Sequence, residues 1–461
     1  SFIPYVWVGG TGGGVCFFAD SDEGWVPNDK VPAIEIRRDG KSADLVLNLI
    51  GSPATIDKPR KIVFALQASP VKPLHKGWRM DSWWCGDTFR NYVYPDGKGS
   101  LIWQSLPFTT DTEACRKMVE AQHRAVNGYI FGINKYRANA VPYYEYNTMG
   151  AVPEKAYFGE EWQASSGPLY YGKTLTDFIM YNMDKWCRET GIDGWYLDNV
   201  RPVYCDNIEA GRGYRLGDGR VQPTYTMFGM REFFLRLRAV FVDNGRAPKI
   251  VNHMTNNMII PWNGAVDIAY DGEHHVIYPE MGKDFMDFWS LERLRVDFAG
   301  QWGTAVNFMH EYQGTWDPAS HKKAMRAYTG VVALHDALPS GNSNGGNQEL
   351  WIGRDRFGIE ADDVEFIPYW QKDAGLTCAT KDVYVGCWKR PGKVLLIVVN
   401  KGEKCDAAVK VDSAKLGLPA GSECKAWDAE TEAKLGIAAD GMLRVPVGRH
   451  DYRQVIVEVA K

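Results

Sequence analysis

The sequence predicts a multidomain protein in which an α/β barrel of the (β/α)8 TIM type lies between two all-β regions. Three observations lead to this prediction: strands and turns without a helical period over residues 1–76, helices alternating with short strands over 77–375, and strands alone over 376–461. A length of 461 residues fits about three domains. We therefore expect an N-terminal β domain resembling a sandwich, a (β/α)8 barrel and a C-terminal β-sandwich with those bounds.

The first 76 residues have the pattern of an antiparallel sheet. Apolar residues alternate with polar or small ones over 34–36 and 45–49, and glycine and proline separate the runs. The glycine cluster at 9–14 precedes a strand-like segment, whereas a phosphate-binding loop would precede a helix and usually contain a lysine. We interpret it as a hairpin turn.

The middle of the chain repeats a helix followed by a strand. A helix from about Thr174 ends at Gly191, and the strand Gly194–Leu197 follows at once. Parallel strands joined by helices form right-handed units, and a length of about 290 residues favours a closed barrel over an open sheet. The further expected helices are 226–243, 283–299 and 320–333, and the further expected strands are 138–146, 249–252, 265–270 and 304–309.

The last region shows no helical period. Short apolar runs separated by turn residues predict the strands of a small sandwich. These runs are 383–388, 394–399, 408–411, 443–447 and 455–459.

Composition excludes several classes of protein. The 53 basic and 57 acidic residues give a net charge of −4, which argues against nucleic acid or an anionic membrane as a partner. No apolar run approaches the roughly 18 residues of a membrane span. The nine cysteines lack any Cys-x-x-Cys spacing, so we expect no zinc ribbon or redox motif, and no other metal or cofactor signature is present.

Aromatic residues are abundant, with 17 Trp, 23 Tyr and 19 Phe. Trp and Tyr offer an apolar face with a polar edge, which suits a ligand such as a sugar, although an aromatic-rich core explains the same composition. The alternative of a packed core stays open for each aromatic taken singly.

In a barrel, the active site lies where the strands end, so polar residues just after each strand are the candidates. Acids dominate that set, and two carboxylates facing each other across a sugar are what glycosidic cleavage needs. The set comprises Asp81, Glu145, Asp198, His253, Asp271, Glu273, Glu311, His335 and Asp336.

Asp198 is the sharpest candidate because the apolar strand Gly194–Leu197 carries the chain through the core and leaves the acid at its exit. A carboxylate there costs stability unless it is paired or hydrogen-bonded, which suggests a catalytic use. The structural alternative is an acid that caps the following helix or loop.

Asp271 and Glu273 follow the strand at 265–270 and lie two residues apart, so in an extended segment both point to one side. We predict Glu273 as a catalytic acid and Asp271 as a second candidate; the alternative is that one of them caps a turn or binds a stabilising cation. Glu311 is a further candidate for the catalytic acid or for the second acidic residue.

The predicted substrate-binding residues are aromatic or polar side chains near strand ends. His253 is expected to hydrogen-bond the substrate, because the histidines lack the spacing of a zinc site. The full set is Trp83, Trp84, Tyr144, Glu145, His253, His274, Trp302 and Glu311.

At these residues the chain resembles glycoside hydrolase family 123 and, more closely, uncharacterised bacterial proteins related to it. The strand sequence Gly-Trp-Tyr-Leu-Asp at 194–198 is similar to the barrel strand that carries the family's catalytic acid. Residues 7–10 and 17–25 resemble the N-terminal β region, 64–73 the approach to the barrel, and 427–428 and 450–453 the terminal β domain.

The resemblance implies a hydrolase with a β-sandwich, a barrel and a C-terminal β domain. Family 123 enzymes are β-N-acetylgalactosaminidases in which an adjacent Asp-Glu pair works with the substrate: the Asp steadies the acetamido group and the Glu donates the proton. This sequence departs from that pair, because Asn199 follows Asp198.

Two reactions are therefore compatible with the sequence. In the first, which we favour, Asp198 is a nucleophile and Glu273 the acid/base of an exo-acting, retaining glycosidase. In the second, Asp198 orients an acetamido group and Glu273 or Asp271 supplies the proton of an N-acetylhexosaminidase.

A third interpretation is a non-catalytic carbohydrate-binding protein, which Asn199 favours and the other acids oppose. Each interpretation names a carbohydrate as the partner, without nucleic acid or a membrane span. For a polysaccharide-degrading hydrolase we expect a periplasmic or extracellular location, and no feature indicates the oligomeric state.

Overall fold

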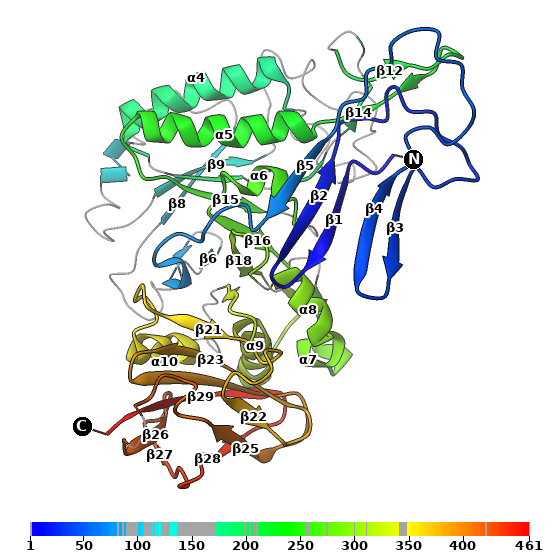
Figure 1. The fold of residues 1–461 in the computed structure, drawn as a ribbon. Coiled ribbons are helices and arrows are strands. Elements are labelled where there is room, and N and C mark those ends of the chain that lie inside the picture. Colours follow the sequence, from blue (N-terminus) through cyan, green and yellow to red (C-terminus); the bar gives the residue numbers. More distant parts are fainter. Residues whose placement is uncertain are drawn as a thin grey trace.

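The computed structural model shows a mixed α/β region with further β-sheets on either side of it in the sequence (Figure 1). It describes residues 2–80, 83–84, 87–88, 100–105, 113, 116–117, 119–120, 130–135, 171–192, 194–197, 200–202, 204–206, 208, 211–253, 258–272, 275–298, 300–309, 311–340, 348–419 and 422–460.

The N-terminal region is a three-stranded antiparallel sheet with a separate hairpin. Strand β1 (Tyr5–Gly10) pairs with β2 (Gly13–Phe18), which pairs with β5 (Ala65–Ser69); β3 (Ile34–Asp39) pairs with β4 (Ser42–Leu47). The glycine cluster forms the β1–β2 turn, which confirms the predicted hairpin. At Gly13 a Cβ would meet the backbone oxygen of Ser69 at 2.3 Å, so this close approach requires glycine.

A nine-stranded sheet, here called the central sheet, forms the middle of the molecule. Its last seven strands are parallel and lie in chain order, as right-handed helical connections require, and β6 and β7 form an antiparallel hairpin at the other edge. The strands are β6 (Trp83–Trp84), β7 (Asp87–Thr88), β8 (Ser100–Ser105), β9 (Ile130–Lys135), β10 (Gly194–Leu197), β15 (Lys249–His253), β16 (Ile268–Asp271), β18 (Ala305–Phe308) and β20 (Leu338–Pro339).

Closure of this sheet into a barrel stays a prediction. Among the described residues no pairing joins β20 back to β6 or β7. The mixed α/β character and the parallel order of the strands are present as expected, and the predicted strand at 138–146 lies outside the described residues.

Helices of varied length and several pairs of two-residue strands accompany the central sheet. In Figure 1, α4 and α5 lie side by side, and they pack against each other. The helices are α4 (Lys173–Thr190), α5 (Met227–Asp243), α6 (Ile260–Asn263), α7 (Phe285–Phe288), α8 (Leu291–Phe298), α9 (Pro318–Ala333) and α10 (Gln348–Phe357), with 3-10 turns η1 (Trp78–Met80) and η5 (Pro279–Met281). The two-residue strands are β11 (Tyr204–Cys205), β12 (Tyr214–Arg215), β13 (Val221–Gln222), β14 (Thr224–Tyr225), β17 (Val276–Ile277) and β19 (Glu311–Tyr312).

The predicted helix at 283–299 is two helices, α7 and α8. The break follows Trp289, whose backbone is extended, and the Ser290 hydroxyl then accepts the N–H of Arg293. A serine in that place is a helix N-cap, so the helix restarts there. By contrast, α4 ends at Gly191 as expected, with φ at 78°.

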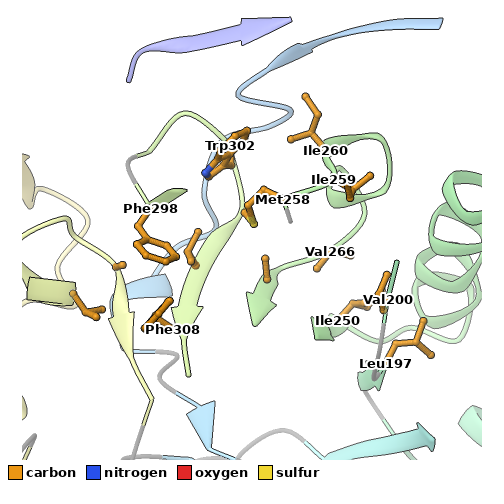
Figure 2. Packing of buried hydrophobic residues seen from close by; sticks show 14 of the residues in the cluster. Leu197, Val200, Ile250, Met258, Ile259, Ile260, Val266, Phe298, Trp302 and Phe308 are labelled. Atoms are coloured by element: carbon orange, nitrogen blue, oxygen red, sulfur yellow. The ribbon is translucent and has the colours of Figure 1, made fainter. Parts of the chain in front are cut away.

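Successive residues of the central strands face opposite sides. Tyr196, Val251, Ile268 and Tyr270 belong to one cluster, which we call the inner face together with Ala305, Met309 and Leu338. Their neighbours in sequence belong to a larger cluster on the outer face, against the helices. Figure 2 shows outer-face residues Leu197, Ile250 and Phe308 on their strands, with Met258, Ile259 and Ile260 nearby.

The C-terminal region is a sandwich of two antiparallel sheets, with an apolar cluster shared between them. The six-stranded sheet contains β21 (Glu365–Ile367), β23 (Val383–Arg390), β24 (Lys393–Asn400), β29 (Asp451–Val459), β26 (Cys424–Asp428) and β27 (Lys434–Leu435). The three-stranded sheet contains β22 (Leu376–Cys378), β25 (Cys405–Val411) and β28 (Met442–Val447). The first strand, β21, begins before residue 376.

Strand β24 joins this sandwich to the central region. Val394, Leu396 and Val398 point into the sandwich, while Leu395 and Ile397 belong to the cluster of the central region. Burial on both faces explains the unbroken apolar run of β24. Among the described helices, none is both long and apolar enough to cross a membrane.

Arg326 of α9 is the main ionic contact between the two regions. Its Nε donates to Asp451 at 2.7 Å, its two Nη atoms donate to Glu430 at 3.1 Å, and Nη2 donates to the Tyr452 carbonyl at 3.0 Å. Only 11% of the side chain is exposed.

We expect Arg326→Ala to lower the free energy of unfolding by about 3 kcal/mol, because it removes the nearest cation from the half-buried carboxylates of Glu430 and Asp451. Arg453 stays 3.5 Å from each of them. Urea unfolding measures the change. Arg293→Ala is the matched control, since the Arg293–Asp297 pair on α8 is exposed and should contribute less than about 1 kcal/mol. Equal losses in the two variants would contradict this account.

His335 gives the protein a predicted pH dependence. The buried ring donates its Nδ1–H to the Val331 carbonyl at 2.7 Å, and burial lowers the pKa of His335 to about 4. The unfolded chain therefore takes up a proton below its usual pKa of about 6.5 while the folded protein does not. Its stabilising contribution is complete above that value and is lost as the pH falls toward 4.

We expect the free energy of unfolding of the parent protein to fall between pH 7 and pH 4 by about 3 kcal/mol more than that of His335→Gln. Denaturant titrations at each pH give the comparison. Two curves that fall in parallel would show that His335 does not carry this linkage.

Candidate active site at the carboxyl edge of the central sheet

A group of buried polar side chains lies on the inner face, near the carboxyl ends of the parallel strands. The Tyr196 hydroxyl of β10 shares a hydrogen bond of 2.8 Å with Nδ1 of His253, the last residue of β15. The ring of His253 lies 5.1 Å from that of Tyr270 on β16. Their side chains are at most 4% exposed, so these groups form the floor of the candidate site.

Two more strands contribute to the same group. The Tyr270 hydroxyl shares a hydrogen bond of 3.2 Å with the hydroxyl of Ser340, which directly follows β20. Asn307 of β18 is fully buried and lies between Ala305 and Met309, both inner-face residues, so alternation places it on the same side. We call Tyr196, His253, Tyr270, Asn307 and Ser340 the polar floor.

The polar floor is a set of hydrogen-bonding groups that contains no carboxylate. Hydroxyl, imidazole and amide groups both donate and accept hydrogen bonds, and the aromatic rings add apolar faces. In parallel α/β sheets, ligands bind outside the carboxyl ends of the strands, where this group lies. The arrangement can bind and orient a hydroxyl-rich ligand, while acid catalysis would need carboxyl groups from elsewhere.

His253 is thus one predicted substrate-binding residue that the structure puts at the expected edge. The backbone after β10 is tied to it, because the N–H of Val200 donates to the His253 carbonyl at 2.8 Å. The sequence prediction placed His253 just after its strand, and the structure makes it the final strand residue.

Asp271 does not join the polar floor. It is the last residue of β16 and follows the inner-face residue Tyr270, so its side chain starts on the opposite side of the strand. Its partner in the pairing with β18 is the outer-face residue Phe308, and its carboxylate accepts the N–H of Gly272 at 2.7 Å. These contacts describe a buried acid at the strand end, apart from His253.

Trp302 packs inside the protein and is not the sugar platform that its sequence position predicted. It precedes β18, which places it at the amino end of the sheet, and its ring lies 4.7 Å from that of Trp7. Its Nε1 donates to the Asp297 carbonyl at 2.9 Å and only 5% of the residue is exposed.

Two further strand-end candidates, His335 and Asp336, precede β20 and so lie at its amino end. Asp81 lies outside the described residues. The other predicted residues cannot be placed as side chains in the described part of the chain. Trp83, Trp84 and Glu311 contribute backbone to β6 and β19. The remaining predicted site residues lie outside the described residues: Asp198, Glu273, Tyr144, Glu145 and His274.

Sequence reasoning did not select Tyr270, Asn307 and Ser340. The predicted candidates were residues just after each strand, so polar residues within the strands were not among them. A period-two analysis of β16 and β18 would have found Tyr270 and Asn307, because each lies two residues from an apolar inner-face residue.

One group among the described residues has the composition of a metal site. The ligand atoms of Asp284, Asp287 and His450 lie within 4.8 Å of one another. However, Asp284 accepts the N–H of Met286, Asp287 accepts the N–H of Asp284, and His450 bonds Asp284 at 2.8 Å. These bonds account for the group as the cap of α7 and its contact with the sandwich.

No family model matches the chain, and no curated protein matches it in sequence. The resemblance to family 123 therefore stays a prediction. The chain is similar in structure to a maltogenic α-amylase from Thermotoga neapolitana, with 12% identity, coverage of 76% of this chain and 81% of that chain, and a TM-score of 0.44.

Two further solved structures show similarity of the same kind. A glycoside hydrolase family 30 xylanase from Clostridium acetobutylicum has 12% identity over 82% of this chain and 95% of that chain, with a TM-score of 0.45. An α-amylase from Geobacillus thermoleovorans has 11% identity over 80% of this chain and 91% of that chain, with a TM-score of 0.48. Similarity of this strength does not support a conclusion about the activity of this chain.

We expect Tyr196→Phe to lower the free energy of unfolding by about 1–2 kcal/mol, because it removes the hydrogen bond to the buried His253 ring. Urea unfolding tests this. Tyr181→Phe is the control, since Tyr181 on α4 is 70% exposed and its hydroxyl should contribute little. A loss no larger than that of the control would show that the Tyr196–His253 bond does not stabilise the polar floor.

Proposed function

We propose that this protein is a glycoside hydrolase that binds its substrate at the carboxyl edge of the central sheet. The polar floor is the observation that carries the proposal, because buried donors, acceptors and aromatic rings meet on one face at the edge where parallel sheets bind ligands. A sugar offers hydroxyl groups at its rim and apolar faces above and below, and it fits such a surface.

The catalytic acids in this proposal are Asp198 and Glu273. They follow β10 and β16 in the sequence, and β15, which carries His253, pairs with both strands. Strands two places apart are separated by about 10 Å, a span across which two acid side chains directed toward each other can hold a sugar. Retaining enzymes have carboxyl groups about 5–5.5 Å apart.

In the proposed reaction the Asp198 carboxylate attacks the anomeric carbon while Glu273 gives its proton to the departing glycosidic oxygen. The bond from the anomeric carbon to that oxygen breaks as the bond to Asp198 forms. Water then attacks the glycosyl-enzyme, Glu273 takes up the proton from that water, and Asp198 is released with the anomeric configuration retained.

His253 would hydrogen-bond a substrate hydroxyl in this scheme, with Tyr196 as the residue that fixes its ring. An exo-acting mode belongs to the same proposal. Asp271 is the second candidate for proton donation.

Two alternatives are set against this proposal, and Asn199 favours only the second of them. A substrate-assisted N-acetylhexosaminidase would cleave only substrates with a 2-acetamido group, and a carbohydrate-binding protein would cleave none. The same panel of aryl glycosides, with and without that group, separates both from the proposed retaining enzyme.

We expect Asp198→Asn and Glu273→Gln each to lower the rate of sugar release from the best aryl glycoside by about 10²–10⁴-fold. Colorimetric release of the aryl group measures the rate. Asp243→Asn, an exposed acid at the end of α5, is the matched control and should keep the parent rate. Full activity in both acid variants would overturn the assignment of these residues.

A further inference from the structure

Two cavities share Trp370 as a lining residue. The first has a volume of about 320 Å³ and is lined by Trp78, Thr304, His335 and Trp370 among others. Thr304 precedes β18 and His335 precedes β20, so this cavity lies at the amino end of the central sheet, opposite the carboxyl edge.

The second cavity has a volume of about 500 Å³ and lies on the sandwich. Its lining comes from the segment 369–373, the edge strand β22 and the start of β23. Both volumes fall within the range of about 300–1,000 Å³ typical of small-molecule sites. Trp370 lines both cavities, and together they are here called the Trp370 groove.

The lining of the sandwich part combines aromatic rings with exposed polar groups. Tyr369, Trp370 and Tyr384 are half-buried and supply the rings. The exposed polar lining consists of Gln371, Lys372, Asp373 and Thr377, with one positive and one negative charge. A ligand that matches this surface has apolar faces, a hydrogen-bonding rim and no net charge, which describes a neutral sugar chain.

Contacts with neighbouring residues hold the aromatic surface in place. The Trp370 ring lies 4.8 Å from Tyr369, with an interplanar angle of 86°, and 5.7 Å from His335. The Arg295 guanidinium lies 5.8 Å from the centre of the Trp370 ring. The Tyr369 hydroxyl donates to the Leu291 carbonyl at 3.2 Å, which fixes the neighbouring ring to α8. A surface fixed before binding loses little conformational entropy on binding.

We propose that the Trp370 groove binds a chain of neutral sugar residues, as a second carbohydrate site distinct from the carboxyl edge of the central sheet. The proposal rests on the proposed function in so far as the substrate is a carbohydrate. Strand β24 packs against both the sandwich and the central region that carries the polar floor. A polymer bound in the groove is therefore tethered to the protein that carries the proposed catalytic site.

Affinity electrophoresis of the full chain in gels containing starch, xylan or galactomannan tests the proposal. The groove variants are Tyr384→Ala, which removes one ring, and Thr377→Arg, which leaves the rings and fills the groove from the exposed edge strand. The matched control is Tyr181→Ala, an exposed ring on α4. Circular dichroism verifies that each variant is folded.

We expect the parent protein to be retarded by at least one of these neutral polysaccharides, and both groove variants to lose about tenfold or more in affinity. Tyr181→Ala and Asp198→Asn should bind like the parent. With a polymer substrate at low concentration, the groove variants should also lose activity, while their release of an aryl group from a small glycoside stays at the parent rate.

No retardation of the parent by any of the polysaccharides would overturn the groove proposal, as would binding that both groove variants retain. Either result leaves the proposed hydrolase intact if aryl glycosides are still cleaved. Conversely, polysaccharide binding lost in the groove variants of a protein that cleaves no glycoside would support the groove and overturn the hydrolase.

Discussion

The alternation of side chains along β10, β15, β16 and β18 is the constraint on which the rest of the structure depends. Each strand has to satisfy two environments at once, because one side packs against helices and the other carries the inner-face cluster. The outer side is mainly apolar, as Figure 2 shows for Leu197, Ile250 and Phe308. Asn252 and Asp271 are buried polar residues on that side. On the inner side, β16 changes from Ile268 to Tyr270 and β18 changes from Ala305 to Asn307. These changes from apolar to polar residues toward the carboxyl ends create the floor of the candidate site.

The same two-sided burial joins the C-terminal sandwich to the central region. Val455 and Val457 of β29 point into the sandwich, and Tyr452 and Ile456 of the same strand pack on the central region. Gly330 of α9 permits this contact, since a Cβ there would lie 3.0 Å from that of Tyr452. The sandwich, which lines part of the Trp370 groove, therefore packs directly against the central region.

Local signals in the sequence predicted many of the elements, whereas the ends of the strands, and the side that each residue there faces, were harder to predict. Helix α4 and strand β10 were expected almost residue for residue, because Gly191 ends the helix and an unbroken apolar strand follows. Trp302 was wrongly predicted as a site residue because it lies near a strand but precedes it, whereas the active-site edge is at the ends of the strands. Asp271 was expected beyond its strand, and its place within β16 turns it away from His253. The polar floor depends on register between strands distant in sequence, which no single segment reveals.

A crystal structure of the Glu273→Gln variant with a bound oligosaccharide tests the central claim most directly. The account predicts a sugar ring above Tyr196 and His253, with the carboxyl carbon of Asp198 and the side-chain amide carbon of residue 273 about 5–5.5 Å apart on either side of the scissile bond. A sugar bound only away from this edge, with Asp198 directed away from the polar floor, would contradict it.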